Sequence, residues 1–255
     1  MIGSTRRLLT YLLLITFTSI YLLGCSAQFI RKALGENYQF DTDPKSVIIQ
    51  LDQKTWPLGD VPGQDCNYIP NLRIWGDGKV VYADFSGGNR RVLTGTISKD
   101  KIIEILKLLD KYGFFNSPQE EQSPSNITGY GILVNVNGHS FHSFSSEKNE
   151  TYDTILSLID VNSLIDFIPE KGFLVVGPYR GFSSIDTIPE WTSNISFSLS
   201  ELVGTGRWIN GSIAEYVWNT INEQSEPLTG MREGSNVFAI GLEVESISPQ
   251  DPPFD

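Results

Sequence analysis

The sequence predicts an α+β fold in which an antiparallel sheet with hairpins packs against amphipathic helices, followed by a smaller β-α-β unit. Two patterns indicate hairpins: NLRIWGDGKVVYADF (71–85) and GILVNVNGHSFHSF (131–144) place β-rich runs around a glycine-containing turn. Glycine tolerates the positive backbone angles that tight hairpins need, and Asn-Gly is a strong hairpin signal. A third pattern, apolar residues at helical spacing after Ser98, predicts a helix that covers the sheet.

The first unit is expected to span residues 45–168. Besides the two hairpins, SVIIQLD (46–52) and RVLTGTIS (91–98) are strand candidates because they are rich in β-branched residues. The first helix should begin at Ser98 as its N-cap and end near Gly113. A second helix, continuing with a break to Ile168, is predicted from the spacing of its apolar residues, Tyr152, Ile155, Leu156 and Ile159.

The second unit is expected to span residues 172–250. FLVVGPYRG (173–181) is a predicted strand, INGSIAEYVWNTINE (209–223) a predicted helix, and NVFAIGLEVES (236–246) a predicted final strand. Between the first strand and the helix, the sequence is typical of loops, although ISFSLSEL could be a strand or the start of a helix. Residues 251–255 are expected to be an unstructured tail.

The N-terminal segment has the three parts of an export signal. Arg6 and Arg7 form a basic patch, an apolar run of 16 residues follows from Leu8 to Leu23, and Gly24 precedes Cys25. The apolar run is shorter than the roughly 20 residues that a spanning helix needs. An ordinary secretory signal with a chance cysteine and an uncleaved signal anchor are the alternatives.

Leu22-Leu23-Gly24-Cys25 resembles the lipobox of bacterial lipoproteins. The resemblance implies that residues 1–24 are removed and that Cys25 receives a diacylglyceryl thioether and an amine-linked acyl chain. It therefore implies an extracytoplasmic protein, anchored by lipid to the plasma membrane or the outer membrane. Residues 25–44 are polar and without clear periodicity, so we expect them to form a lipidated tether between the membrane and the domain.

A second resemblance concerns the first unit, which is similar to a loosely defined class of uncharacterised bacterial lipoprotein domains. It covers about half of the chain and has no established activity or catalytic residues, so it bears on the fold alone. The matching features are Cys66, Pro70, Leu72–Gly78, Ser98 and Gly113-Phe114-Phe115.

The net charge indicates which binding partners are disfavoured, and the cysteine content indicates whether a disulfide can form. Without residues 1–24 the chain has 17 basic and 30 acidic residues, a formal charge of −13. Such acidity disfavours nucleic acid and anionic headgroups, so the acyl chains should provide the membrane contact. If Cys25 is lipidated, Cys66 has no cysteine to pair with in its own chain, and its acidic surroundings favour a buried side chain over a reactive thiol.

No residue set predicts a catalytic centre, and we expect no metal and no cofactor. The two histidines, His139 and His142, are three positions apart in a predicted strand and should point to opposite faces. Hydrolysis by paired carboxylates is the main alternative to binding. The candidate carboxylate pairs, expected to be solvated, are Glu120 with Glu121 and Glu243 with Glu245.

Aromatic residues give the most specific hypothesis for binding. Trp191 and Trp208 lie in loop-like sequence, and Tyr179 and Arg180 precede them. Tryptophan, tyrosine and arginine are enriched at binding surfaces, so these four residues are our candidate contact surface. The sequence thus predicts a lipid-anchored module that binds an envelope protein, a peptide or a glycan. A purely structural lipoprotein is a further alternative.

Overall fold

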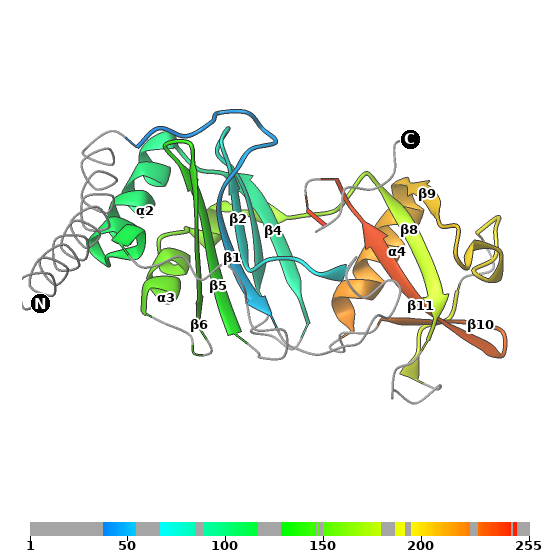
Figure 1. Ribbon diagram of the computed structural model, residues 1–255. Coiled ribbons are helices and arrows are strands. Elements are labelled where there is room, and N and C mark those ends of the chain that lie inside the picture. The colour runs from blue at the N-terminus through cyan, green and yellow to red at the C-terminus, as the bar shows by residue number, and fades with distance from the viewer. Residues whose placement is uncertain are drawn as a thin grey trace, which may run out of the picture.

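The computed structural model contains two antiparallel sheets that lie side by side (Figure 1). Helices α2 and α3 cover the face of the first sheet that points away from the second sheet. The α+β class is confirmed. The structure describes residues 38–54, 67–84, 89–116, 129–145, 147, 150–179, 187–191, 195–224, 229–245 and 247–248.

The first sheet has seven strands in the order β6-β5-β1-β2-β3-β4-β7, and every neighbouring pair is antiparallel. Both predicted hairpins are confirmed, with Gly78 (φ 88°), Asn137 (φ 53°) and Gly138 (φ 73°) in the left-handed conformation that the turns require. The strands are β1 (Val47–Lys54), β2 (Leu72–Trp75), β3 (Lys79–Asp84), β4 (Arg91–Thr96), β5 (Gly129–Val136), β6 (His139–Ser145) and β7 (Ile165–Asp166).

Helix α2 (Lys99–Lys111) begins as predicted, with the Ser98 hydroxyl accepting the Lys101 N–H at 3.2 Å. Its apolar stripe packs on alternate residues of the sheet, since a strand presents every second side chain to one face. Helix α3 (Glu150–Ser157) is shorter than predicted: the chain then forms a 3-10 turn and the edge strand β7. Pairing of Ile165 and Asp166 with β4 takes the place of the expected helical continuation to Ile168.

The second sheet has four antiparallel strands in the order β10-β11-β8-β9. The predicted strands and helix are present, but β8 and β11 run antiparallel and two further strands flank them, so the β-α-β arrangement is not confirmed. Strands β9 and β10 have four residues each, too few for a periodic pattern. The elements are β8 (Lys171–Pro178), β9 (Arg207–Asn210), α4 (Gly211–Glu223), β10 (Gly230–Glu233) and β11 (Asn236–Glu243).

The two sheets share apolar contacts. The second face of the first sheet contributes Trp75, Val81, Ala83 and Val92 to the same core cluster as α4 and the inner face of the second sheet. Because apolar burial is the main favourable term in folding, this shared core holds the two sheets together.

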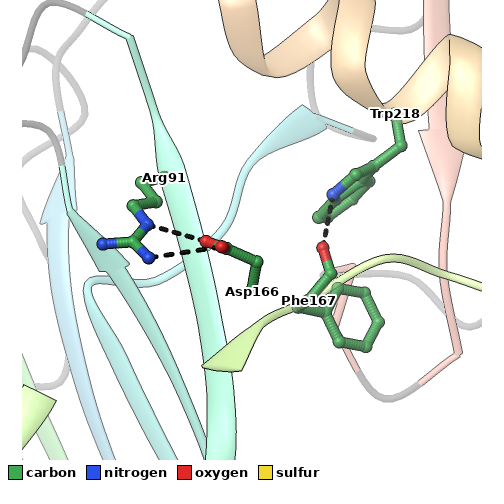
Figure 2. Close-up of polar contacts among 4 residues, drawn as sticks. All are labelled: Arg91, Asp166, Phe167 and Trp218. Carbon is green, nitrogen blue, oxygen red and sulfur yellow. Dashed lines mark hydrogen bonds and ion pairs between the residues drawn. The ribbon is translucent and has the colours of Figure 1, made fainter. Parts of the chain in front are cut away.

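The segment that joins β7 of the first sheet to β8 of the second, here called the link, makes polar contacts with both sheets' units (Figure 2). Asp166 pairs with Arg91 of β4 at 2.7 and 3.2 Å, which lowers the pKa of the Asp166 carboxyl. Phe167 donates its N–H to the Val92 carbonyl at 2.8 Å, and its own carbonyl accepts Nε1–H of Trp218 from α4, also at 2.8 Å. The link therefore joins β4 of the first sheet to α4 of the second.

Residues 38–46, here called the N-terminal strap, lie against the first sheet. Tyr38 is 8% exposed and belongs to the core under α2, and Phe40 packs against the same core. The backbone of Asp41 passes so close to Gly76 that a Cβ there would lie 1.8 Å from the Asp41 carbonyl oxygen. Residues 38–44 are thus part of the folded body and not of the expected tether. Tyr38 and Phe40 pack against apolar residues that are distant in the sequence, and a local pattern does not predict such contacts.

Candidate functional site

A shallow depression of about 480 Å³ lies beside the second sheet. Its apolar lining residues are Trp191, Ile195 and Phe197, and the indole Nε1–H of Trp191 donates to the Phe197 carbonyl at 3.1 Å. Polar side chains from the segment 195–201 and from the end of β10 form its rim. The rim residues that carry hydroxyl or carboxylate groups are Ser196, Ser198, Glu201 and Glu233.

Glu201 and Ser198 form a reciprocal cap at the start of the 3-10 turn Ser200–Leu202. The Ser198 hydroxyl accepts the Glu201 N–H at 3.3 Å, and the Glu201 carboxylate lies 3.5 Å from the Ser198 nitrogen. The pair resembles a Ser-x-x-Glu capping box, but Ser198 lies one residue before Leu199, the N-cap of the turn. The ISFSLSEL segment therefore contains only a three-residue 3-10 turn, so it is neither the strand nor the start of an α-helix that its sequence allowed.

Glu233 of β10 binds the same turn. Its two oxygens accept the N–H groups of Leu199 at 2.9 Å and Ser200 at 3.2 Å. Both carboxylates in the depression therefore bind backbone donors, which favours a structural role over acid–base chemistry. Each carboxylate oxygen has a second lone pair, so both groups keep the capacity to accept a further hydrogen bond from a ligand.

Trp191 is a core residue, which corrects its expected exposed position. It is 7% exposed, and its ring centroid lies 5.6 Å from that of Phe197 and 6.2 Å from that of Tyr216 in α4. Its backbone also bonds to β10 through the Arg232 carbonyl. The sequence around it is typical of a loop, but this loop packs over α4, so the indole contributes burial rather than an exposed surface.

The structure does not bring the other predicted contact residues to Trp191. Trp208 is half-buried in β9, where its ring lies 5.8 Å from that of Phe173 and under the Lys171 ammonium at 4.9 Å. Strands β9 and β10 are the two edges of the second sheet, so Trp208 and Trp191 are three strands apart. Tyr179 packs its ring on Gly230 of β10, and Arg180 lies outside the described residues.

The structure also does not bring the other residues considered in the sequence together into one site. The His139 ring contacts that of Phe141 on one face of β6. His142 lies opposite Leu133 in the neighbouring strand, and its side chain is on the other face of β6, as the spacing predicts. Glu243 is buried at 8% exposure, whereas Glu245 is exposed, so only the second matches the expected solvated face. Glu120, Glu121, Cys25 and Cys66 lie outside the described residues. Within the described ranges, no group of three His, Cys, Asp or Glu side chains could hold a metal ion.

A polar network between the sheets was not predicted. Asn67 donates to the Ile240 carbonyl at 2.9 Å and accepts the Leu242 N–H at 3.2 Å, so it bonds to the part of β11 that lies past its pairing with β10. Arg90 bonds to the Asn67 carbonyl and to the Asn222 side chain at the end of α4. Burial lowers the pKa of Arg90 to about 10, so its guanidinium stays charged at neutral pH.

The sequence offered little signal for these contacts. Only the fold brings Asn67 to Ile240, and only the fold brings Glu233 to Leu199. Single asparagines or glutamates in turns are common, so these residues do not form a recognisable sequence pattern. The Ser-x-x-Glu spacing at Ser198 is the exception, because it is a helix-start pattern that can be read locally.

Comparison with known proteins supplies no relative for this chain. No family model, curated protein or solved structure matches it. In the part of the chain that the structure describes, no helix is both long and apolar enough to cross a membrane.

Proposed function

We propose that this protein is exported, lipidated on Cys25, and serves as a binding module in the bacterial envelope. The observation that carries the location is the Leu22-Leu23-Gly24-Cys25 pattern at the end of a short apolar run. Two or more acyl chains hold a protein stably on a bilayer, whereas one chain holds it only marginally. Lipidation of Cys25 would therefore account for membrane attachment of an otherwise acidic, polar body.

The body would consist of the 45–168 unit, with residues 38–44 packed against it, and the 172–250 unit, with β8, α4 and β11 as the β-α-β element of the latter. The depression beside Trp191 is the proposed ligand site. Its rim of hydroxyls and carboxylates suits a ligand that donates hydrogen bonds, such as a glycan or a peptide with an ammonium group. The use of Glu201 and Glu233 as backbone acceptors supports binding over hydrolysis.

Intact-mass analysis of membrane-extracted protein tests the anchor. The wild type should have the mass of residues 25–255 plus a diacylglyceryl group and an acyl chain. Cys25→Ala should lose this mass and leave the membrane fraction, whereas Cys66→Ala, the matched control, should be lipidated normally. A wild-type polypeptide that begins at Met1, or one with a free thiol on Cys25, would overturn the proposed location.

A second prediction concerns the ligand site. Soluble peptidoglycan fragments, which carry both sugar hydroxyls and peptide ammonium groups, should shift the NMR amide signals of residues 196–201. Ser196→Tyr should abolish the shifts because the larger side chain fills the depression at an exposed rim position. Ser212→Tyr, an equal change at an exposed position on α4, should leave them intact. No shifts in the wild type, or equal shifts in both variants, would contradict the proposed site.

A further inference from the structure

The depression beside Trp191 offers little aromatic surface to a ligand. Trp191 and Phe197 both line it, but they are only 7% and 9% exposed. The Arg207 guanidinium of β9 also lies over the Phe197 ring, 4.5 Å from its centroid. Stacking of a sugar requires an exposed ring face, because the gain comes from the apolar area that both partners bury. The small area that remains therefore suits a slender group better than a sugar ring.

The lining of the depression takes its charge from Glu201 and Glu233. In the part of the chain that the structure describes, no lysine or arginine forms an ion pair with either of them. Arg232 precedes Glu233, but successive residues of a strand point to opposite faces, and its guanidinium pairs with Glu190 at 3.2 Å. The lining is thus formally negative, and its two carboxylates keep their charge available to a cation.

Backbone hydrogen bonds hold both carboxylates at one short segment. The Glu201 carboxylate lies 3.5 Å from the Ser198 nitrogen, and Glu233 accepts the N–H groups of Leu199 and Ser200 at 2.9 and 3.2 Å. These three nitrogens belong to consecutive residues, whose Cα atoms are about 3.8 Å apart. An ammonium has three donors and no acceptor, so it complements two neighbouring carboxylates better than a hydroxyl does.

We propose that the depression binds an aliphatic primary ammonium, such as the side chain of a lysine or another diamino acid in a peptide. This rests on the ligand site proposed above and decides between its two candidate ligands. The ammonium would bond to Glu201 and Glu233, and its methylene stem would lie against the half-buried Ile195. The formal charge of −13 on the chain without residues 1–24 would attract such a ligand over a longer range.

Acetylation of the ligand tests the ammonium separately from the site. Nα-acetyl-lysine methylamide, whose ε-ammonium is free, should shift the NMR amide signals of residues 196–201. Its Nε-acetylated form has no charge and should bind about tenfold more weakly, since hydrogen bonds to charged groups are the stronger ones. Soluble peptidoglycan fragments should likewise lose their shifts when their amino groups are acetylated. Equal shifts with and without acetylation would overturn the ammonium ligand and leave the site, whereas no shifts from any of these compounds would overturn the site itself.

Glu201→Gln tests the charge of the site while keeping an oxygen that can accept the Ser198 N–H. Binding of the lysine compound should weaken about three- to tenfold, because the charge on the acceptor is lost. Glu150→Gln, at an exposed position on α3 of the first sheet, is the matched control and should bind like the wild type. Raising NaCl to about 0.5 M should weaken binding to the wild type more than to Glu201→Gln, because salt screens exposed charges. Equal affinities of Glu201→Gln and the wild type would contradict the proposal.

Discussion

Trp218→Ala is expected to lower the free energy of unfolding by about 3–5 kcal/mol, the usual range for removing a buried tryptophan. Trp218 is 4% exposed in the core that the two sheets share. Its ring lies 5.4 Å from that of Phe167 in an edge-to-face arrangement, and its Nε1–H bonds to the Phe167 carbonyl. The substitution therefore removes apolar burial and the contact that ties α4 to the link between the sheets. Urea unfolding followed by circular dichroism measures the change.

Two further variants separate the contributions of Trp218. Trp218→Phe keeps most of the ring but leaves the Phe167 carbonyl without its indole donor, so it should cost about 1–2 kcal/mol more than an exposed substitution. Tyr112→Ala, at a 41% exposed aromatic position, should be close to neutral. If Trp218→Ala costs no more than Tyr112→Ala, the shared core does not hold the two sheets together. An unfolding curve with two separate transitions would support two units that fold independently.

Gly76→Ala is expected to displace the N-terminal strap from the first sheet. The new Cβ would lie 1.8 Å from the Asp41 carbonyl oxygen and 2.9 Å from the Thr42 Cα, and both are backbone atoms that cannot rotate away. Release of the strap would expose Tyr38 and Phe40, which should cost about 2–3 kcal/mol in unfolding free energy. Hydrogen exchange measures the local effect: the Ser46 amide, bonded to the Asp43 carbonyl, should lose its protection.

Gly138→Ala is the matched control for Gly76→Ala. Gly138 also lies in a hairpin turn of the first sheet, but a Cβ there meets nothing within 4 Å. Because Gly138 has a φ of 73°, alanine there should lower the free energy of unfolding by only the cost of a left-handed backbone conformation, about 1–2 kcal/mol. The Ser46 amide should keep its protection in this variant. Unchanged exchange at Ser46 in Gly76→Ala would mean that the strap does not lie against Gly76.

Local patterns allowed much of the first sheet to be predicted. The turns at Gly78 and Asn137-Gly138 and the cap at Ser98 depend on residues only a few positions apart, so their geometry is already implied by the sequence. The end of α3 was predicted less well, because pairing of Ile165 with Thr94 takes that segment into a strand. Strand pairing over such a distance depends on packing, which single-chain periodicity does not contain.

The sequence alone determined the turn positions, the amphipathic helices and the acidic charge, because the turns and helices depend on neighbouring residues and the charge on composition. Only the tertiary structure decided that Trp191 is buried, that Glu201 and Glu233 bind backbone N–H groups, and that Tyr38 is buried in the core of the first sheet. Glu233 and Leu199, like Tyr38 and Phe115, are distant in sequence and meet only when the core forms. A side chain is buried only when another part of the chain packs against it, so its burial cannot be read from its own neighbours in the sequence.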